Sequence, residues 1–210
     1  MNTEKFDYDF IAQIPERENR LEGYLFPDTY FFDPLSSDRE IITKFLDNFD
    51  MKFKLDYYAR AKELNMTVDE IITLASIIEK ETALPEEKPI ISSVFHNRLK
   101  SKDPSLRKLQ TDATIQYILF KRDGKIKEKL TEADTKIDDP YNTYLYEGLP
   151  PGPICSPGLA SIEAALYPEK TDYYYFVAKG DGSHYFSKTL SEHEAAKKRY
   201  IDNKQEESED

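Results

Sequence analysis

Apolar residues recur with a helical period over much of the chain, and two of these stretches open with a clear start signal. Residues 37–40 (SDRE) and 67–70 (TVDE) both have the capping-box spacing, in which a hydroxyl residue is followed three positions later by glutamate. Apolar residues then recur at intervals of three and four. The pattern predicts one helix over residues 37–64 and a second over residues 67–82.

The same kinds of signal predict further helices, and two short aromatic stretches predict strands. The further helices are expected over residues 85–98 with Pro85 in the first turn, from Thr111 or Asp112 to about residue 119, over residues 159–166, and from Ser191 to about residue 203. Residues 172–178 and 183–187 flank a Gly-rich turn and predict a β-hairpin. The chain is therefore expected to be a helix-rich α+β protein with a small C-terminal β-hairpin.

The domain organisation follows from where these patterns start and stop. Residues 1–20 are polar with scattered aromatic residues and predict a lead-in that is mostly loop. Residues 21–203 carry the helix and strand patterns without an obvious linker, so they are expected to form one domain. Residues 204–210 are mostly acidic and predict a disordered tail. The polar opening has no start signal of its own, so we expect the chain to be cut from a longer protein.

The composition argues against several classes of function. The 210 residues carry a formal net charge of −11, which argues against nucleic acid as a partner because phosphate binding needs a basic surface. A single cysteine, Cys155, rules out an intramolecular disulfide, and the three histidines have no metal-ligand spacing. The sequence contains no phosphate-binding glycine loop, nucleophile elbow or membrane-length apolar run. We therefore expect no metal and no cofactor.

Two glutamates stand where the helix over residues 67–82 loses its apolar stripe. At roughly 100° per residue, Glu79 and Glu81 fall on opposite borders of that stripe, so periodicity does not choose between them. Most glutamates are simply surface residues. A carboxylic acid at the wall of a core, however, can have its pKa raised by desolvation, which suits a general acid near neutral pH. Beside 15 Tyr and 12 Phe, such chemistry fits glycan cleavage, because aromatic rings and hydroxyls contact sugars.

Two irregular stretches are candidates for the walls of a site. Residues 21–34 are too aromatic for a solvated loop and too interrupted by Gly and Pro for a helix. They are interpreted either as a strand and turn packed into the core, which is slightly favoured, or as the rim of a cleft that directs Glu22 or Asp28 inward. Residues 141–158 are long and stiffened by proline, and ordered loops of this kind often line sites.

Several motifs occur in an order and spacing that closely resemble one known protein family. They are residues 74–82 (LASIIEKET), 94–99 (VFHNRL), 109–112 (LQTD), 141–144 (YNTY), 148–152 (GLPPG), 156–158 (SPG) and 175–178 (YFVA), with Glu22-Gly23 and residues 26–29 (FPDT) upstream. The family is that of the endolytic murein transglycosylases, also called YceG-like or MltG. The resemblance runs from residue 21 to residue 200 and is carried by several long motifs.

The resemblance implies a lysozyme-like catalytic domain over residues 21–203 that acts on peptidoglycan glycan strands. The family cleaves the MurNAc–GlcNAc bond within nascent strands without using water, which leaves a 1,6-anhydro-MurNAc end and terminates elongation. One glutamate acts first as an acid on the bridging oxygen and then as a base on the C6 hydroxyl of MurNAc.

The resemblance also implies a cellular setting. Family members act at the extracytoplasmic face of the bacterial cell membrane, where an N-terminal membrane helix anchors them ahead of a small LysM-like domain. Neither segment is expected within this chain, so membrane contact is expected only through a segment outside it. Cell-wall synthases are further candidate partners.

The resemblance finally ranks the two glutamates. Related lytic transglycosylases carry serine directly after the catalytic glutamate, and Glu81-Thr82 is the matching glutamate–hydroxyl pair here. Glu81 is therefore expected to be catalytic, with Thr82 bonded to its carboxyl or to sugar and Glu79 paired with a nearby lysine. The residues expected to contact substrate are Glu22, Thr82, Gln110, Thr111, Asp112, Tyr141, Asn142, Thr143, Tyr144 and Ser156.

Two other functions stay open on the sequence alone. A hydrolytic muramidase would use Glu81 with a second carboxylate at Asp112 or Glu22, since hydrolysis needs a group that activates water or attacks the sugar. A non-catalytic glycan-binding or scaffold module of the cell-wall machinery would need neither carboxylate. A triad of Ser76 or Ser156 with His184 and an aspartate has no supporting local motif.

Overall fold

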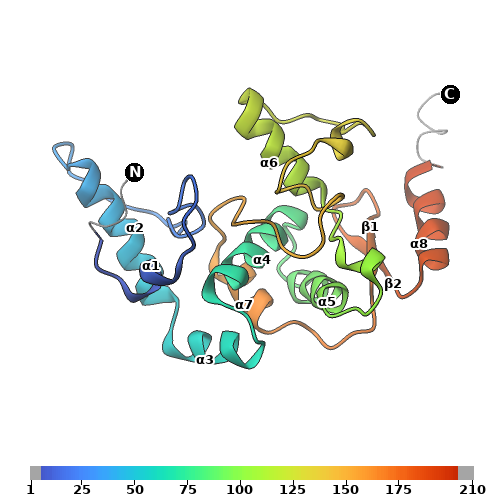
Figure 1. Cartoon of the computed structure of the whole chain (residues 1–210), viewed down its shortest axis with the longest axis horizontal. Helices are drawn as coiled ribbons and strands as arrows, with labels where there is room; N and C mark the ends of the chain where they lie inside the picture. Colours follow the sequence, from blue (N-terminus) through green and yellow to red (C-terminus); the bar gives the residue numbers. More distant parts are fainter. Residues whose placement is uncertain (1–5, 203–210) are drawn as a thin grey trace.

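The computed structural model describes residues 6–202 of the chain, which fold around one buried helix (Figure 1). The α-helices are α1 (Asp9–Gln13), α2 (Asp38–Lys52), α3 (Leu55–Glu63), α4 (Val68–Glu81), α5 (Lys88–Leu99), α6 (Asp112–Asp123), α7 (Leu159–Leu166) and α8 (Leu190–Lys197). The remaining elements are strands β1 (Tyr175–Ala178) and β2 (His184–Ser187), the 3-10 turns η2 (Pro104–Arg107) and η3 (Asp134–Lys136), and the π-helical turn η4 (Lys198–Asp202). The expected helix-rich α+β class with a C-terminal hairpin is confirmed.

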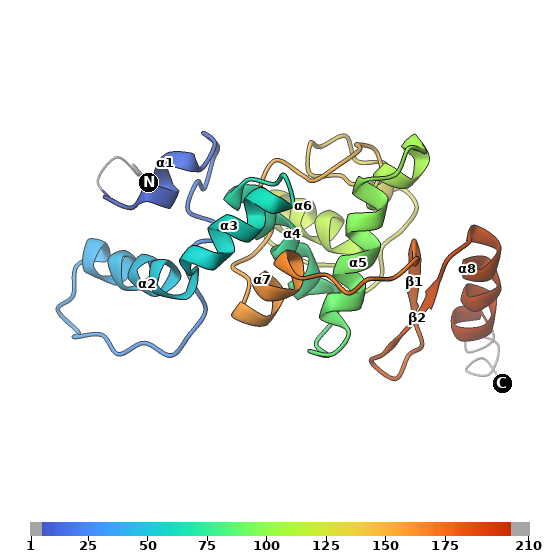
Figure 2. The ribbon, with the colours of Figure 1, turned by 90° about the horizontal axis from the view of Figure 1, so that it is seen from below.

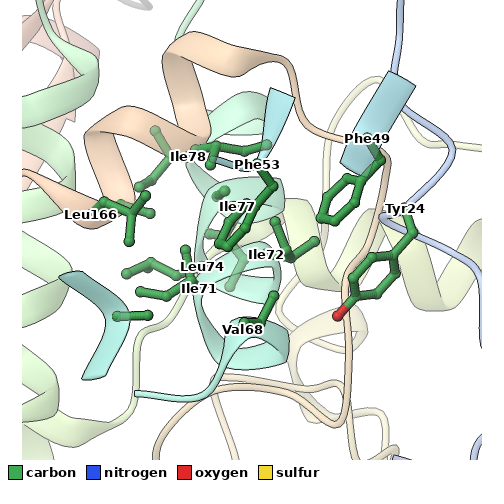
Figure 3. Packing of buried hydrophobic residues seen from close by; sticks show 14 of the residues in the cluster. Tyr24, Phe49, Phe53, Val68, Ile71, Ile72, Leu74, Ile77, Ile78 and Leu166 are labelled. Carbon is green, nitrogen blue, oxygen red and sulfur yellow. The ribbon is translucent and has the colours of Figure 1, made fainter. Parts of the chain in front are cut away.

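Helix α4 occupies the middle of the molecule, and the other helices are arranged around it (Figures 1 and 2). Helices α5 and α7 pack along it, and α1, α3 and α6 contact it as well. Every side chain over residues 71–78 is buried, and Figure 3 shows its apolar residues beside Phe49 and Phe53. Burying one large aliphatic side chain contributes about 1.5–3 kcal/mol, so the core rather than helix propensity holds α4 in place.

The predicted capping box sets the start of α4. The Thr67 hydroxyl accepts a hydrogen bond from the backbone N–H of Glu70, whose carboxylate accepts one from the backbone N–H of Thr67. The helix ends at Glu81, because the backbone of Thr82 is extended. This helix is confirmed to within one residue at each end.

The predicted N-terminal loop contains a short helix instead, because its scattered aromatic residues are core anchors. Phe10 in α1 is fully buried and stacks on Tyr24 with 5.6 Å between ring centroids. The Arg20 guanidinium donates to the backbone carbonyls of Ile11 and Ile14, which satisfies the end of α1. Residues on both sides of the expected boundary after Arg20 thus share one core, and the boundary itself stays a prediction.

The single helix expected over residues 37–64 is broken into α2 and α3. Its capping box is confirmed, since Ser37 and Glu40 exchange both hydrogen bonds. The break falls at Phe53, whose backbone leaves the helical region (φ −83°, ψ 80°) while its ring is buried. The bend directs α3 against α4 and α7, so tertiary packing overrides a continuous helical pattern.

Two predicted helix starts are displaced by a few residues. Helix α5 begins at Lys88 rather than Pro85, and Pro89 takes the first-turn position, where a missing N–H costs nothing. Helix α8 is capped by Thr189 rather than by Ser191, because Thr189 completes a capping box directly after the hairpin.

The hairpin is confirmed, although its strands are shorter than expected. Strands β1 and β2 pair antiparallel, with Tyr175 opposite Ser187 and Ala178 opposite His184. The backbone N and ring Nδ1 of His184 lie 2.9 and 2.6 Å from the carboxylate oxygens of Glu87, which ties the hairpin to the start of α5. Figure 2 shows the hairpin and α8 together at one end of the molecule, beyond α5.

Only part of the aromatic stretch over residues 21–34 is buried in the core. Leu21, Tyr24 and Phe26 are buried in the core, whereas Phe31 is 87% exposed. The first half of the stretch therefore packs into the core as expected, but as turns, because no strand forms over residues 21–34.

None of the helices between residues 6 and 202 combines the length and hydrophobicity that crossing a membrane requires. The tail predicted at residues 204–210 lies outside the described residues.

Gly23 lies where the aromatic stretch crosses α4, and its φ is +93°. A Cβ at this position would lie 2.5 Å from Cγ of Pro153 and 2.9 Å from Cγ2 of Ile72. We expect Gly23→Ala to lower the free energy of unfolding by about 3 kcal/mol, because backbone strain and overlap act together. Chemical denaturation measures the loss.

Gly124→Ala is the matched control, because Gly124 also has a positive φ of 68° and its added Cβ would meet no atom within 4 Å. Only backbone strain applies there, so we expect a loss of about 1 kcal/mol. Equal losses in the two variants would contradict the overlap at Gly23.

Candidate functional site

Two hollows in the surface meet beside the C-terminal end of α4. The first, here called the hairpin groove, has a volume of about 470 Å³ and lies between α4, α5, the start of α6, the hairpin and α8. The second, the α6 groove, has a volume of about 630 Å³ and lies between the end of α4, α6 and residues 154–155. Glu81 and Asp112 line both grooves, so these two carboxyl groups stand at the junction.

Glu81 is the last residue of α4, and its side chain is half-buried at the junction of the grooves. Its Oε1 atom is buried and has no hydrogen-bond partner among the described residues. Burial, followed by the negative charge of Asp112, raises the pKa of Glu81 to about 7, although a hydrogen bond from Thr111 opposes the shift. A carboxyl with that pKa is partly protonated near neutral pH, so it can donate a proton as a general acid.

Glu79 is held as a structural anion. Lys88 Nζ lies 2.9 Å from its Oε2, and the Ser161 hydroxyl and the Gly158 backbone N–H also donate to that oxygen. Burial acts to raise the pKa of Glu79, but hydrogen bonds from Ser161 and Lys88 outweigh it and hold the pKa below its ordinary value. The expected pairing of Glu79 with a lysine is confirmed, and the structure favours Glu81 as the acid.

Thr82 is the clearest departure from the expected site. Its side chain is buried, and its hydroxyl lies 3.5 Å from the Glu87 carboxylate and accepts a hydrogen bond from the backbone N–H of Leu84. Thr82 makes no hydrogen bond to the Glu81 carboxyl among the described residues, because the extended backbone after the helix turns its side chain towards α5. Its contact with sugar stays a prediction. Its observed role is to end α4.

Asp112 and Thr111 begin α6, which brings them against the end of α4. The Thr111 hydroxyl caps the helix by accepting from the backbone N–H of Thr114, and Asp112 occupies the first turn. The Tyr144 hydroxyl donates to Asp112 Oδ1 at 2.5 Å. Burial and this carboxylate raise the pKa of Tyr144 above its ordinary value, so it stays a donor. The predicted contact residues that line the hairpin groove with Glu81 are Gln110, Thr111, Asp112 and Tyr144.

The three residues before Tyr144 support the site without lining either groove. Asn142 is fully buried, and its Oδ1 accepts from the backbone N–H of Tyr144. The buried hydroxyl of Thr143 accepts from the backbone N–H of Thr111 at 3.0 Å. Tyr141 packs its ring against a tyrosine of α6. The contacts of Asn142 and Thr143 position Tyr144 and Thr111, and the predicted contact of all three residues with substrate stays a prediction.

Glu22 lines the α6 groove with Glu81 and accepts a hydrogen bond from the Tyr117 hydroxyl at 2.6 Å. Ser156 lies in a neighbouring hollow that Glu22 also lines and Glu81 does not, and its predicted contact with substrate stays a prediction. Asp28 bonds to a side chain of α2 and lines neither groove. Of the two carboxylates considered for a rim, only Glu22 shares a groove with Glu81.

Several groove residues are not among the predicted contact residues. Those of the hairpin groove are Arg98, Tyr175, His193 and Lys197, and those of the α6 groove include Lys80 and Tyr117. Lys80, Arg98 and Tyr175 lie within motifs that carry the family resemblance, which is the signal that could have identified them. The others come from separate segments that only the folded chain brings together.

A metal site, a serine triad and a cysteine nucleophile find little support in the part of the chain that the structure describes. No group of three His, Cys, Asp or Glu side chains within residues 6–202 is arranged to hold a metal ion. The Ser76 hydroxyl is buried and accepts from the backbone N–H of Ile154, while His184 faces Glu87. Burial raises the pKa of the Cys155 thiol to about 11, which makes it a poor nucleophile.

The chain is similar to known bacterial proteins over most of its length. A model of the YceG-like family matches residues 2–199. The endolytic murein transglycosylase of Bacillus subtilis strain 168 is 45% identical over 186 residues, which cover 89% of this chain and 49% of the relative. The endolytic murein transglycosylase of Streptococcus pneumoniae strain R6 is 37% identical over 204 residues, which cover 92% of this chain and 35% of the relative.

A solved structure has a similar fold. The crystal structure of a YceG-like protein from Listeria monocytogenes superposes with a TM-score of 0.75 at 40% sequence identity, covering 90% of this chain and 63% of that chain. The chain spans about half of the length of the Bacillus relative and about a third of the Streptococcus relative.

The raised pKa of Glu81 makes folding stability depend on pH. The pKa rises from 4.5 to about 7 on folding, so the folded state binds the proton more tightly and stability falls as the pH rises between these values. We expect Glu81→Gln to remove this loss and raise the free energy of unfolding by about 1–3 kcal/mol at about pH 8, with little change at about pH 4. Urea denaturation at both pH values measures the difference.

Glu79→Gln is the matched control, because it makes the same change in a carboxylate whose pKa is lowered. It removes the ion pair with Lys88, so we expect a less stable protein at about pH 8. If both variants were more stable than the parent at that pH, Glu81 would not be the desolvated carboxyl.

Proposed function

Because the chain belongs to the YceG-like family, we propose that it holds the catalytic region of an endolytic murein transglycosylase. The proposed substrate is the peptidoglycan glycan strand, and the proposed new ends are 1,6-anhydro-MurNAc. The observation that carries the proposal is the position of Glu81, whose carboxyl has a pKa near neutrality at the junction of two grooves.

In the proposed reaction Glu81 starts protonated and donates its proton to the oxygen that bridges MurNAc and GlcNAc. The bond between that oxygen and C1 of MurNAc breaks, and its electron pair leaves with the oxygen. The Glu81 carboxylate then takes the proton of the C6 hydroxyl of MurNAc, whose oxygen bonds to C1. Glu81 ends protonated, as it began, and no water is consumed.

The surroundings of Glu81 suit a residue that acts as an acid and then as a base. Burial and the charge of Asp112 both disfavour its anion, so the carboxylate left after the first step takes a proton back readily. Asp112 also places negative charge beside a sugar whose C1 becomes positive as the bond breaks. The hydrogen bond from Tyr144 fixes the direction of that carboxylate.

The two grooves offer room for a strand on both sides of the cleaved bond. The hairpin groove and the α6 groove have only Glu81 and Asp112 in common as lining residues. A strand bound along both grooves would therefore pass the acid at an internal bond. This arrangement favours internal cleavage over removal of units from a strand end.

A hydrolytic muramidase is the second candidate, because two further carboxylates lie in the grooves with the acid. Glu22 shares the α6 groove with Glu81, and Asp112 shares both. Either is a candidate for the second carboxylate that hydrolysis requires.

The proposed activity also implies where the protein works. Nascent glycan strands lie at the extracytoplasmic face of the bacterial cell membrane, so we place the reaction there, with cell-wall synthases as candidate partners. The net charge of −11 disfavours nucleic acid as a partner.

Mass spectrometry of glycan digested in oxygen-18 water separates the candidate functions. A transglycosylase gives unlabelled anhydro ends, each one water lighter than a reducing end, whereas a muramidase gives labelled reducing ends. We expect anhydro ends from the parent protein, and a rate lower by a factor of about 10²–10⁴ in Glu81→Gln, which loses acid and base together.

Glu79→Gln is again the matched variant, and we expect it to retain much of the activity in its folded fraction. Labelled reducing ends would favour the muramidase, and unchanged glycan would favour a binding module. Full activity in Glu81→Gln would refute the assignment of the acid.

The pH dependence of kcat/KM distinguishes one carboxylate from two. The acid must be protonated in the free enzyme, so we expect kcat/KM to fall about tenfold per pH unit above about pH 7 and to be level on the acid side while the protein stays folded. A muramidase also needs an ionised second carboxylate, which adds an acid limb and gives a bell-shaped profile. A bell that disappears in Glu22→Gln would therefore contradict the one-residue mechanism, whereas Asp112→Asn does not discriminate because both mechanisms use the charge of Asp112.

A further inference from the structure

Gln110 adopts a backbone conformation that residues with a side chain rarely take. Its φ is +55°, in the left-handed region where Cβ crowds the backbone. The conformation is held firmly, since the backbone N–H of Gln110 donates to the Thr143 carbonyl and that of Thr111 to the Thr143 hydroxyl, both at 3.0 Å. An unfavourable conformation held in this way at the wall of a groove points to a function.

Arg98 fixes the direction of the Gln110 side chain. The buried Arg98 guanidinium donates to the backbone carbonyls of Leu106, Lys108 and Tyr174. Its Nη2 also donates to Oε1 of Gln110 at 2.8 Å. Because a guanidinium has donors only, the amide oxygen must be the atom that faces it. The amide nitrogen Nε2 is therefore directed away from Arg98.

The Nε2 of Gln110 is a donor for which the described residues provide no acceptor. Gln110 is exposed and lines the hairpin groove. Leu109 and Val177 give the same groove apolar surface. An N–H donor in a mainly polar groove that also has apolar lining residues matches a chemical group that combines a carbonyl oxygen with a methyl, which is the make-up of an acetamido group.

The choice of glutamine over glutamate at this position is informative. Arg98 is buried, yet its acceptors within residues 6–202 are three backbone carbonyls and one amide, with no carboxylate. A glutamate at position 110 would give this cation a counter-charge, the usual arrangement for a buried arginine. Glutamine keeps the hydrogen bond and adds N–H donors that a carboxylate lacks. Glutamine at position 110 therefore differs from glutamate in offering an N–H donor to the groove.

We propose that Gln110 determines specificity by donating from Nε2 to the acetamido carbonyl of an N-acetylated sugar in the hairpin groove, with Arg98 as its positioning residue. The acetamido methyl then lies against the apolar wall that Leu109 and Val177 provide. The inference rests on the proposed function, because it takes a glycan of N-acetylated amino sugars as the ligand. It goes further by naming the group that is recognised: a strand without N-acetyl groups binds more weakly.

Binding to a cleavage-deficient protein tests the proposal apart from the reaction. In the Glu81→Gln background, calorimetry measures the Kd of the N-acetylglucosamine tetramer and of the same tetramer without its acetyl groups. We expect Gln110→Glu to weaken binding of the acetylated tetramer about tenfold. It should strengthen binding of the deacetylated tetramer, whose ammonium groups attract the introduced carboxylate. An unchanged preference in Gln110→Glu would overturn the proposal.

Two control variants separate recognition from charge and from folding. Gln13→Glu adds the same charge on α1, outside both grooves, and should leave both Kd values unchanged. Gln110→Gly removes the side chain and relaxes the left-handed backbone, so it should lose the preference without losing thermal stability. A preference retained in Gln110→Gly would also overturn the proposal.

The positioning role of Arg98 has its own readout, which is the ratio of the two Kd values. Arg98→Lys should reduce the preference for the acetylated tetramer when Gln110 is present and leave the ratio unchanged in Gln110→Gly. Equal effects in both backgrounds would make Arg98 purely structural and overturn its positioning role. Failure of the proposed function appears instead as missing anhydro ends in digests by the parent protein, so the two failures are distinguishable.

Discussion

The burial of α4 on almost every side is the constraint on which the site depends. A helix that crosses the core reaches solvent only where it ends, and the side chains of its last turn stand at that border. Glu81 occupies this place, so the packing that stabilises the fold also desolvates the acid. The negative end of the helix dipole acts in the same direction. The stability of the fold and the raised pKa of Glu81 are thus two results of one packing arrangement.

Asp112, the carboxylate beside Glu81, lies at the N-terminal end of a helix, whereas Glu81 lies at a C-terminal end. Asp112 lies in the first turn of α6, where the helix N-terminus stabilises negative charge, and Tyr144 donates to it. Two carboxyl groups therefore meet at the ends of two helices in different electrostatic environments. The proposed division of labour between a proton donor and a negative charge agrees with this geometry.

Features encoded by local signals could be predicted from the sequence, and features made by distant contacts could not. Capping boxes and periodicity predict the starts of α2 and α4 and the length of α4, but the bend at Phe53 depends on where its ring is buried. Periodicity treats Glu79 and Glu81 alike, because the lysine and serine that bind Glu79 lie on other helices. Thr82 follows the acid in sequence but turns away from it in space. Of the four residues of the YNTY motif, only Tyr144 lines the hairpin groove, and the sequence alone does not show which of them does.

The hairpin and α8 form one wall of the hairpin groove, yet they stand at the edge of the molecule (Figure 2). They join it through contacts such as His184 with Glu87 and Phe176 with Phe95, while the acid belongs to the central helix. The groove wall and the surroundings of Glu81 are therefore held by different contacts. The shape of this wall can change through substitutions outside α4, while the burial that raises the pKa of Glu81 is set by α4 and its neighbours.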